Sequence, residues 1–204
     1  MTPSPQSTRS HPAKPALLSY AVAGVLLALL MFGTAGFLWF SGRAASAIGG
    51  PFHLVDGAGQ TVTNETYRGK YMLVYFGYTY CPDVCPTTLQ AMTNALDALG
   101  PKANQIAPLF ITVDPARDTP AVMKRYAAAF SPRLIGLTGS PEQIARVTKE
   151  YHVYAAKDVT GPGPDYSMDH SSVIYFMGKD GQFIAPVQEG APKQMAASIE
   201  KLMS

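Results

Sequence analysis

Cysteine is scarce in this sequence of 204 residues, which contains only two. Both lie in the stretch GYTYCPDVCPTTL, residues 77–89, as Cys81 and Cys85 with three residues between them. A disulfide between them would close so short a loop that it would remove little entropy from the unfolded chain. Structural cross-linking therefore explains the pair poorly, and redox chemistry and metal binding remain.

The sequence also lacks a basic cluster in its last three quarters. From Ile48 onward, 13 Lys and Arg residues stand against 14 Asp and Glu residues. This balance gives no electrostatic reason for binding a polyanion, so we expect no nucleic-acid partner. Acidic residues are in turn absent before Ile48, where the charged residues are Arg9, Lys14 and Arg43.

One long segment contains no charged residue at all: ALLSYAVAGVLLALLMFGTAGFLWF, residues 16–40. As a helix it would be ~37 Å long, enough to cross a hydrocarbon core of ~30 Å with some tilt. The excess of basic residues on its N-terminal side predicts a cytoplasmic N-terminus. We therefore expect a single-pass transmembrane helix in the cell inner membrane, with the C-terminal domain in the periplasm.

A cleaved signal peptide is the alternative, because ASA at residues 45–47 resembles a cleavage site. The apolar run is much longer than the ~7–15 residues of a signal-peptide core, which favours an uncleaved anchor. Lipid attachment is excluded because no cysteine lies near the end of the run. The predicted organisation is a disordered cytoplasmic tail over 1–15, the transmembrane helix over 16–40, a tether over 41–50 and one domain over 51–204.

Within that domain, patterns typical of strands and helices alternate. The expected helices are residues 85–100, 119–130, 140–153 and 192–203. The expected strands are residues 52–56, 61–63, 71–78, 106–114 and 133–139, with a final hairpin over 171–187. Crossover helices predict parallel strands in the first half, and the hairpin adds antiparallel strands at one edge.

These elements predict an α/β fold with a thioredoxin-like mixed sheet flanked by helices, and with an inserted unit before the final hairpin. The two cysteines fall between the first central strand and the first long helix, at the edge of the sheet where ligands usually bind. A helix entrance favours thiolate over thiol. The thiolate is both the redox nucleophile and the metal-binding form, so the location by itself leaves both chemistries open.

A metal held by two thiolates needs a further ligand, and the candidates are histidines. His11 precedes the predicted anchor, His53 lies in the first small strand, and His152 follows a helix. His170 directly precedes the final hairpin, and in a thioredoxin-like sheet that loop approaches the cysteine loop. We therefore expect Cys81, Cys85 and His170 to form the site.

Two thiolates and one imidazole suit copper, as Cu(I) or Cu(II), better than other metals. A zinc site would need a fourth ligand such as Asp169 or water. Asp165 and Asp169 are candidates to orient the imidazole. Met168 is a conceivable additional soft ligand, although Met is more often a packing residue.

Three motifs together resemble the Sco/SenC family of membrane-anchored copper proteins. They are GYTYCPDVCPTTL, TVDPARDTP at residues 112–120, and DYSMDHSSVIYFMGKDGQF at residues 165–183, and they occur in the family's order. The resemblance extends from about Gly50 to the C-terminus. It implies a thioredoxin-like fold and copper bound by Cys81, Cys85 and His170.

The resemblance also implies a role in the assembly of cytochrome c oxidase. The chain would deliver copper to the copper-accepting subunit with the dinuclear centre, and other periplasmic copper carriers are possible partners. Alternatively, it would be a thiol-disulfide reductase that uses Cys81 and Cys85 to keep the acceptor cysteines reduced. A peroxidase is a weaker alternative, because its usual nucleophile context is missing.

Four charged residues near the site have roles that the sequence leaves open. Asp114, Arg117 and Asp118 either fix the cysteine loop or form a docking face, or else the motif only starts a helix, with Asp118 and Thr119 as capping residues. Asp83, between the cysteines, either tunes the charge of the site or caps the turn.

Overall fold

The computed structural model describes residues 24, 27, 29–34, 48–159 and 166–204. It divides into two units, residues 1–46 and residues 47–204. In the first unit, residues 29–34 are helical, with exposed apolar side chains. In the described parts of the chain, no helix combines the length and the apolar character needed to span a membrane. The predicted tail, most of the predicted anchor and most of the tether lie outside the described residues.

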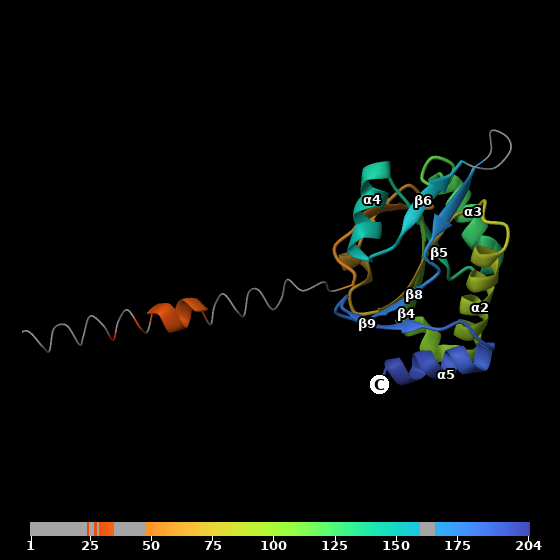
Figure 1. The fold of residues 1–204 in the computed structure, drawn as a ribbon. Helices are drawn as coiled ribbons and strands as arrows, with labels where there is room; N and C mark the ends of the chain where they lie inside the picture. Colours follow the sequence, from red (N-terminus) through yellow and green to blue (C-terminus); the bar gives the residue numbers. More distant parts are fainter. Residues whose placement is uncertain (1–23, 25–26, 28, 35–47, 160–165) are drawn as a thin grey trace, which may run out of the picture. The chain divides into compact units, whose positions relative to one another are not determined.

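The second unit is built on a seven-stranded mixed sheet (Figure 1). The order of the strands across the sheet is β2-β1-β5-β4-β3-β8-β9. Their bounds are β1 His53–Asp56, β2 Thr61–Thr63, β3 Tyr71–Gly77, β4 Ile106–Thr112, β5 Ile135–Thr138, β8 Ile174–Met177 and β9 Phe183–Val187.

The strand directions follow from the connections. β3, β4 and β5 are parallel, because a helix crosses over between each consecutive pair. β8 pairs antiparallel with β3, and β9 with β8, so the C-terminal hairpin lies at one edge. β1 and β2 form a second antiparallel hairpin at the other edge. The predicted thioredoxin-like arrangement of parallel central strands and antiparallel edges is confirmed.

Four α-helices and two short 3-10 helices connect or follow these strands. Their bounds are α2 Val84–Leu99, α3 Pro120–Phe130, α4 Pro141–Glu150, α5 Pro192–Leu202, η1 Asn64–Tyr67 and η2 Gly100–Gln105. The hydroxyls of Thr119 and Ser140 accept the backbone N–H of Val122 and Gln143, so both serve as the predicted N-caps. Each cap is followed by proline at the first helical position.

Helices cover both faces of the sheet, as expected (Figure 1). On one face, the rings of Tyr75 and Phe110 stack, and Phe110 packs against Tyr126 of α3. On the other face, Phe76 packs against Tyr151, the residue that ends α4. Successive residues of β3 therefore point into two apolar layers, which explains why nearly the whole strand is buried.

A second sheet was not predicted. β6 (Ala155–Asp158) and β7 (Ser167–His170) pair antiparallel and form a two-stranded ribbon separate from the main sheet. The inserted unit was expected, but its sequences AAKD and SMDH lack the β-branched and aromatic residues that indicate strands. The ribbon places His170 at the end of a strand rather than in a loop.

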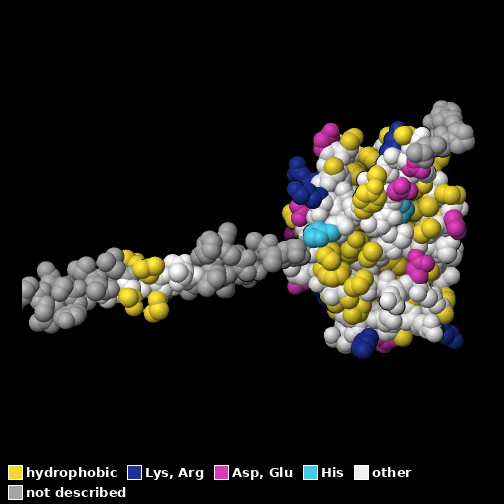
Figure 2. All heavy atoms as spheres, viewed as in Figure 1, with side chains coloured by type: hydrophobic (Ala, Val, Ile, Leu, Met, Phe, Trp, Pro, Cys, Tyr) yellow, Lys and Arg dark blue, Asp and Glu magenta, His cyan; other side chains and the backbone are white. Residues whose placement is uncertain are grey.

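On the face shown in Figure 2, separate Lys, Arg, Asp and Glu side chains are scattered among apolar patches.

Candidate metal centre

The cysteine loop lies between the end of β3 and the start of α2. Cys81 is half-buried in the loop, and Cys85 is buried in the first turn of α2, which begins at Val84, one residue before the predicted start. Both are free cysteines. The backbone N–H of Cys85 donates to Sγ of Cys81 at 3.4 Å. One sulfur therefore accepts an N–H that would otherwise be unsatisfied at the helix entrance.

Glycine at residue 77 allows the second sulfur to sit against the strand. A Cβ added to Gly77 would lie 2.7 Å from Sγ of Cys85 and 3.0 Å from Cε2 of Phe110. Real Cβ atoms do not approach that closely, so the position of Cys85 depends on the missing side chain. Sequence reasoning did not single out Gly77, although it opens the motif that holds both cysteines.

His170 completes the cluster from the distant ribbon. Its Nε2 lies 3.4 Å from Sγ of Cys85, and its Nδ1 lies 3.1 Å from the carbonyl oxygen of Ser171. A carbonyl can only accept, so Nδ1 carries the proton and the lone pair of Nε2 faces the sulfurs. The imidazole also packs edge-on against the rings of Tyr78 and Tyr75, with centroids 5.8 and 6.4 Å away.

The three predicted residues are thus brought together. Sγ of Cys81, Sγ of Cys85 and a ring nitrogen of His170 all lie within 4.8 Å of one another. Bonds of about 2.0–2.3 Å from sulfur and nitrogen to a metal require separations of this order. The other described histidines, His53 and His152, are not part of the group.

The acidic residues of the third motif play a smaller part than expected. Asp169 is exposed and alternates along β7 with half-buried His170, so it points to the other side of the strand. The prediction that it orients the imidazole is not supported, because the carbonyl of Ser171 does so. Asp165 lies outside the described residues. Met168 shares the side of His170 and packs against the core.

The motif TVDPARDTP fixes the cysteine loop and also starts a helix. Buried Asp118 accepts the backbone N–H and the hydroxyl of Thr79 at 3.0 and 2.5 Å, and the hydroxyl of Thr112 at 2.6 Å. Thr119 alone provides the helix cap. Burial raises the pKa of Asp118, although its hydrogen bonds oppose that shift. Asp118 is therefore a loop anchor rather than a capping residue.

The two other residues with open roles are Arg117 and Asp83. Arg117 forms an ion pair with the carboxylate of Asp114, and both are largely buried. Asp83 is the N-cap residue of α2, but its side chain accepts no capping hydrogen bond and is exposed. Of its two interpretations, capping is therefore not supported.

The protonation state of Cys85 differs from the expectation. Burial raises the pKa of the Cys85 thiol to about 12, although a hydrogen bond involving the Tyr78 backbone lowers it. The position near the helix N-terminus does not overcome the loss of hydration. In the absence of metal, Cys85 is therefore a neutral thiol that can donate to Nε2 of His170, and metal binding must release its proton.

Similarity to known proteins extends over most of the chain. Residues 41–204 match the SCO1/SenC family. The chain belongs to that family. It is 43% identical over 159 residues to the mitochondrial protein SCO2 of Saccharomyces cerevisiae, which covers 76% of this chain and 52% of the relative. It is 44% identical over 138 residues to a SCO2-like protein of Rickettsia prowazekii, which covers 67% of each chain.

Solved Sco structures have the same fold. Bradyrhizobium japonicum ScoI, solved with copper bound, is 47% identical, has a TM-score of 0.72 and covers 76% of this chain and 99% of its own. The chain spans about half the length of the yeast relative, so the activity of that whole protein does not transfer directly. The likeness establishes the thioredoxin-like Sco fold.

Proposed function

We propose that this protein binds one copper ion through Cys81, Cys85 and His170. The observation that carries the proposal is the meeting of three soft or borderline donor atoms within 4.8 Å. Two of these atoms are the sulfurs of Cys81 and Cys85 in the cysteine loop. The third is a ring nitrogen of His170, which lies 85 residues after Cys85.

The donor set favours copper over zinc. Thiolates are soft ligands that suit Cu(I), and an added imidazole also allows Cu(II). Structural zinc sites take four protein ligands. Among the described His, Cys, Asp and Glu residues, the cluster contains three. The copper found in the related Bradyrhizobium protein supports the same assignment.

We further propose that the copper is cargo, delivered to the copper-accepting subunit of cytochrome c oxidase during assembly. Cys81 and His170 are only half-buried, so an incoming ligand can reach the site from one side while Cys85 still holds the ion. Three protein ligands also leave room for an acceptor thiolate to bind before the first ligand leaves. Other periplasmic copper carriers would supply the copper to this protein.

Copper stoichiometry and valence test the site. We expect one copper per chain in the wild type, under reducing and under oxidising conditions. His170→Ala should weaken binding at least about tenfold, most strongly for Cu(II), because a nitrogen ligand is lost while both sulfurs remain. Undiminished affinity in His170→Ala would show that the three-ligand site is wrong. His53→Ala is the matched control, since His53 is exposed on β1 and should bind no copper.

A second candidate is thiol-disulfide reduction of the acceptor. The observation that favours it is the unequal exposure of two adjacent free thiols. The Cys81 thiolate would attack a partner disulfide, forming a mixed disulfide and releasing one partner thiolate. Cys85, after losing its proton, would then attack the sulfur of Cys81. The products are a Cys81–Cys85 disulfide and a partner reduced by two electrons.

Trapping distinguishes this reaction from copper delivery. In Cys85→Ser the second step is blocked, so a mixed disulfide through Cys81 should accumulate with an acceptor peptide without metal. No mixed disulfide in either Cys85→Ser or Cys81→Ser would exclude the reductase function and leave the copper function intact.

We also propose the membrane topology predicted above, with residues 16–40 as a single anchor in the inner membrane and residues 51–204 in the periplasm. The support is the uncharged run of 25 residues with basic residues before it. Protease digestion of spheroplasts should remove the C-terminal domain and leave the anchor in the membrane fraction. Release of the whole chain into the periplasm would instead indicate signal-peptide cleavage.

A further inference from the structure

Arg117 lies between the two segments that carry the candidate ligands. The central carbon of its guanidinium is 3.7 Å from the ring centroid of Tyr166, 4.6 Å from that of Tyr80 and 5.7 Å from that of Tyr78. Tyr78 and Tyr80 belong to the chain that leads into Cys81, and Tyr166 directly precedes β7. One cation thus contacts aromatic rings from both segments.

Hydrogen bonds reinforce the contact with the ribbon. Nη1 of Arg117 donates to the carbonyl oxygen of Tyr166 at 2.9 Å, and its Nε pairs with the carboxylate of Asp114. The hydroxyl of Tyr166 donates to the other carboxylate oxygen of Asp114 at 2.8 Å. The backbone and the side chain of Tyr166 are therefore both attached to one buried ion pair.

Two short routes lead from this contact to the imidazole. Tyr166 is four residues before His170 and directly precedes the strand that ends at His170. Tyr78, the innermost of the three tyrosines, packs perpendicular to the His170 ring with centroids 5.8 Å apart. A shift of the guanidinium would therefore affect both the strand that carries His170 and the ring against which His170 rests.

The ribbon needs such an attachment. Among the described strands, β6 and β7 pair only with each other and not with the seven-stranded sheet. An isolated two-stranded ribbon is marginally stable in water. Its placement therefore depends on side-chain contacts, and Arg117 contacts Tyr166, next to the end of the ribbon where Ser167 pairs with Asp158.

We infer that Arg117 is a positioning residue that holds the β6–β7 ribbon so that Nε2 of His170 stays beside Sγ of Cys85. The effect on copper rests on the proposed function, whereas the effect on the ribbon does not. A planar guanidinium can lie flat on an aromatic ring while its in-plane N–H groups donate to neighbouring oxygens, whereas a lysine ammonium has no planar face to stack. The inference therefore requires arginine at residue 117, and another positively charged side chain would not replace it.

The copper test is a double-mutant cycle on the full-length chain. Arg117→Lys keeps a charge beside Asp114 but loses the planar stack. We expect its Cu(I) dissociation constant, measured by competition with a chromophoric chelator, to rise at least about tenfold. In a His170→Ala background the same substitution should change the constant less than about twofold, because the ligand that Arg117 positions is already gone. Equal losses in both backgrounds, or no loss in either, would overturn the inference.

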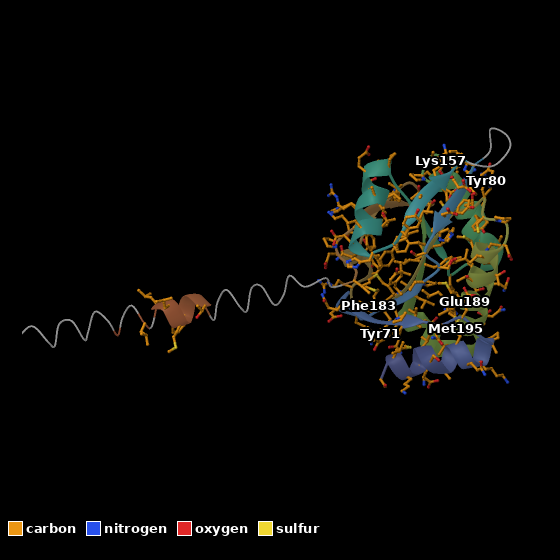
Figure 3. The ribbon with its side chains drawn as sticks, in the orientation of Figure 1. Tyr71, Tyr80, Lys157, Phe183, Glu189 and Met195 are labelled. Atoms are coloured by element: carbon orange, nitrogen blue, oxygen red, sulfur yellow. The ribbon has the colours of Figure 1, made fainter. Side chains whose placement is uncertain are left out.

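Two further variants guard against a general folding defect. Tyr166→Leu removes the ring from the ribbon but leaves the pair of Arg117 and Asp114 intact, and it should reproduce the tenfold loss. Tyr166→Phe keeps the ring and should retain most of the affinity. Lys179→Gln is the matched control, because its ammonium lies 5.0 Å from the ring of Tyr71, at the end of the domain opposite Tyr80 and Lys157 (Figure 3).

A metal-free measurement separates this inference from the proposed function. Amide hydrogen exchange in β7 should accelerate at least about tenfold in Arg117→Lys and in Tyr166→Leu, with no change in β8. If the wild type binds no copper, the proposed function fails and the exchange rates still decide the role of Arg117. If copper binds but exchange in β7 is unchanged, Arg117 does not hold the ribbon.

Discussion

The sulfur half and the imidazole half of the candidate site are built differently. Cys81 and Cys85 follow β3, a central strand of the main sheet whose residues are almost all buried. His170 comes from the β6–β7 ribbon, in which half-buried residues alternate with exposed ones. The first half is part of the hydrophobic core, and the second is attached to it through side chains.

This difference separates stability from binding. Changes that disturb the sulfur half must also disturb core packing, so they should lower the free energy of unfolding together with metal affinity. Changes in the ribbon should move the imidazole while the main sheet stays folded. The following predictions, from the largest expected effect to the smallest, can break or sharpen that contrast.

The largest expected effect concerns the reactivity of Cys85, which belongs to the sulfur half of the site. At pH 8, a thiol with a pKa of about 12, as burial gives Cys85, is ionised in about one molecule in 10⁴. We therefore expect Cys85 in the folded, metal-free protein to react with iodoacetamide at least about 100-fold more slowly than the same thiol in denaturant. Time-resolved mass spectrometry with fragmentation measures both rates. In denaturant the two cysteines should react alike, and similar rates for Cys85 in the folded protein and in denaturant would show that Cys85 is not buried.

Asp118→Ala should destabilise the protein by about 2–3 kcal/mol, because the buried hydroxyl of Thr112 and two donors of half-buried Thr79 lose their acceptor. Urea unfolding at pH 7 measures the change. Thr66→Ala, which removes the hydroxyl that accepts the exposed backbone N–H of Thr63 in a 3-10 helix, is the control and should cost less than about 1 kcal/mol. A loss below about 1 kcal/mol in Asp118→Ala would mean that the carboxylate does not anchor the loop.

The same carboxyl group predicts a dependence on pH. Its pKa is raised in the folded state above the ordinary value of 3.8, so ionisation costs the folded protein stability. The neutral carboxyl group therefore contributes its full stabilisation of the folded state below pH 3.8. This stabilisation is lost as the pH rises through the folded pKa. Relative to Asp118→Asn, the wild type should therefore become less stable as the pH rises from about 4 to 7. A constant difference in unfolding free energy would contradict the shift.

Gly77→Ala should cost about 2 kcal/mol, because the new Cβ would overlap Sγ of Cys85 in a packed core. It should also weaken copper binding, since the sulfur must move. Gly190→Ala is the control, because a Cβ there meets nothing closer than 3.7 Å. If stability falls while copper affinity is unchanged, then β3 shifts to accommodate the new methyl group and the sulfur of Cys85 stays in place.

The smallest effect is expected on the ribbon. Lys157 on β6 places its ammonium 3.6 Å from the ring centroid of Tyr166. Lys157→Gln should lower the free energy of global unfolding by less than about 1 kcal/mol, because the contact is exposed. Lys157→Arg should restore it. If Lys157→Gln lowered the free energy of unfolding as much as Gly77→Ala does, the ribbon would unfold together with the core. The contrast between the sulfur half and the imidazole half would then be wrong.

Local patterns predicted much of this architecture. Proline after Thr119 and after Ser140 marked two helix starts, and the continuous apolar run after Tyr71 marked a buried central strand. The ribbon escaped prediction because its short strands carry few residues with strand preference and bury only alternate side chains. The Sco/SenC motifs led to the family that the comparison then established.

The candidate site likewise has features that the sequence predicted and features that it did not. Cys81 and Cys85 are close in sequence, so their proximity in space follows from chain connectivity alone. The thiol state of Cys85 was not predictable, because its pKa depends on burial by residues from several elements, which outweighs the helix entrance. The roles of Gly77, Ser171 and Arg117 also depend on neighbours that are distant in sequence.

The sequence by itself determined the cysteine pair at a strand–helix junction, two helix caps and the order of the α-helices and of the strands of the main sheet, because these depend on residues within a few positions of one another. Only the tertiary structure decided that His170 turns its Nε2 toward the sulfurs, that a carbonyl and not a carboxylate orients the ring, and that Arg117 joins the two halves. Each of these depends on contacts across the fold, and such contacts arise only when the separate elements pack together.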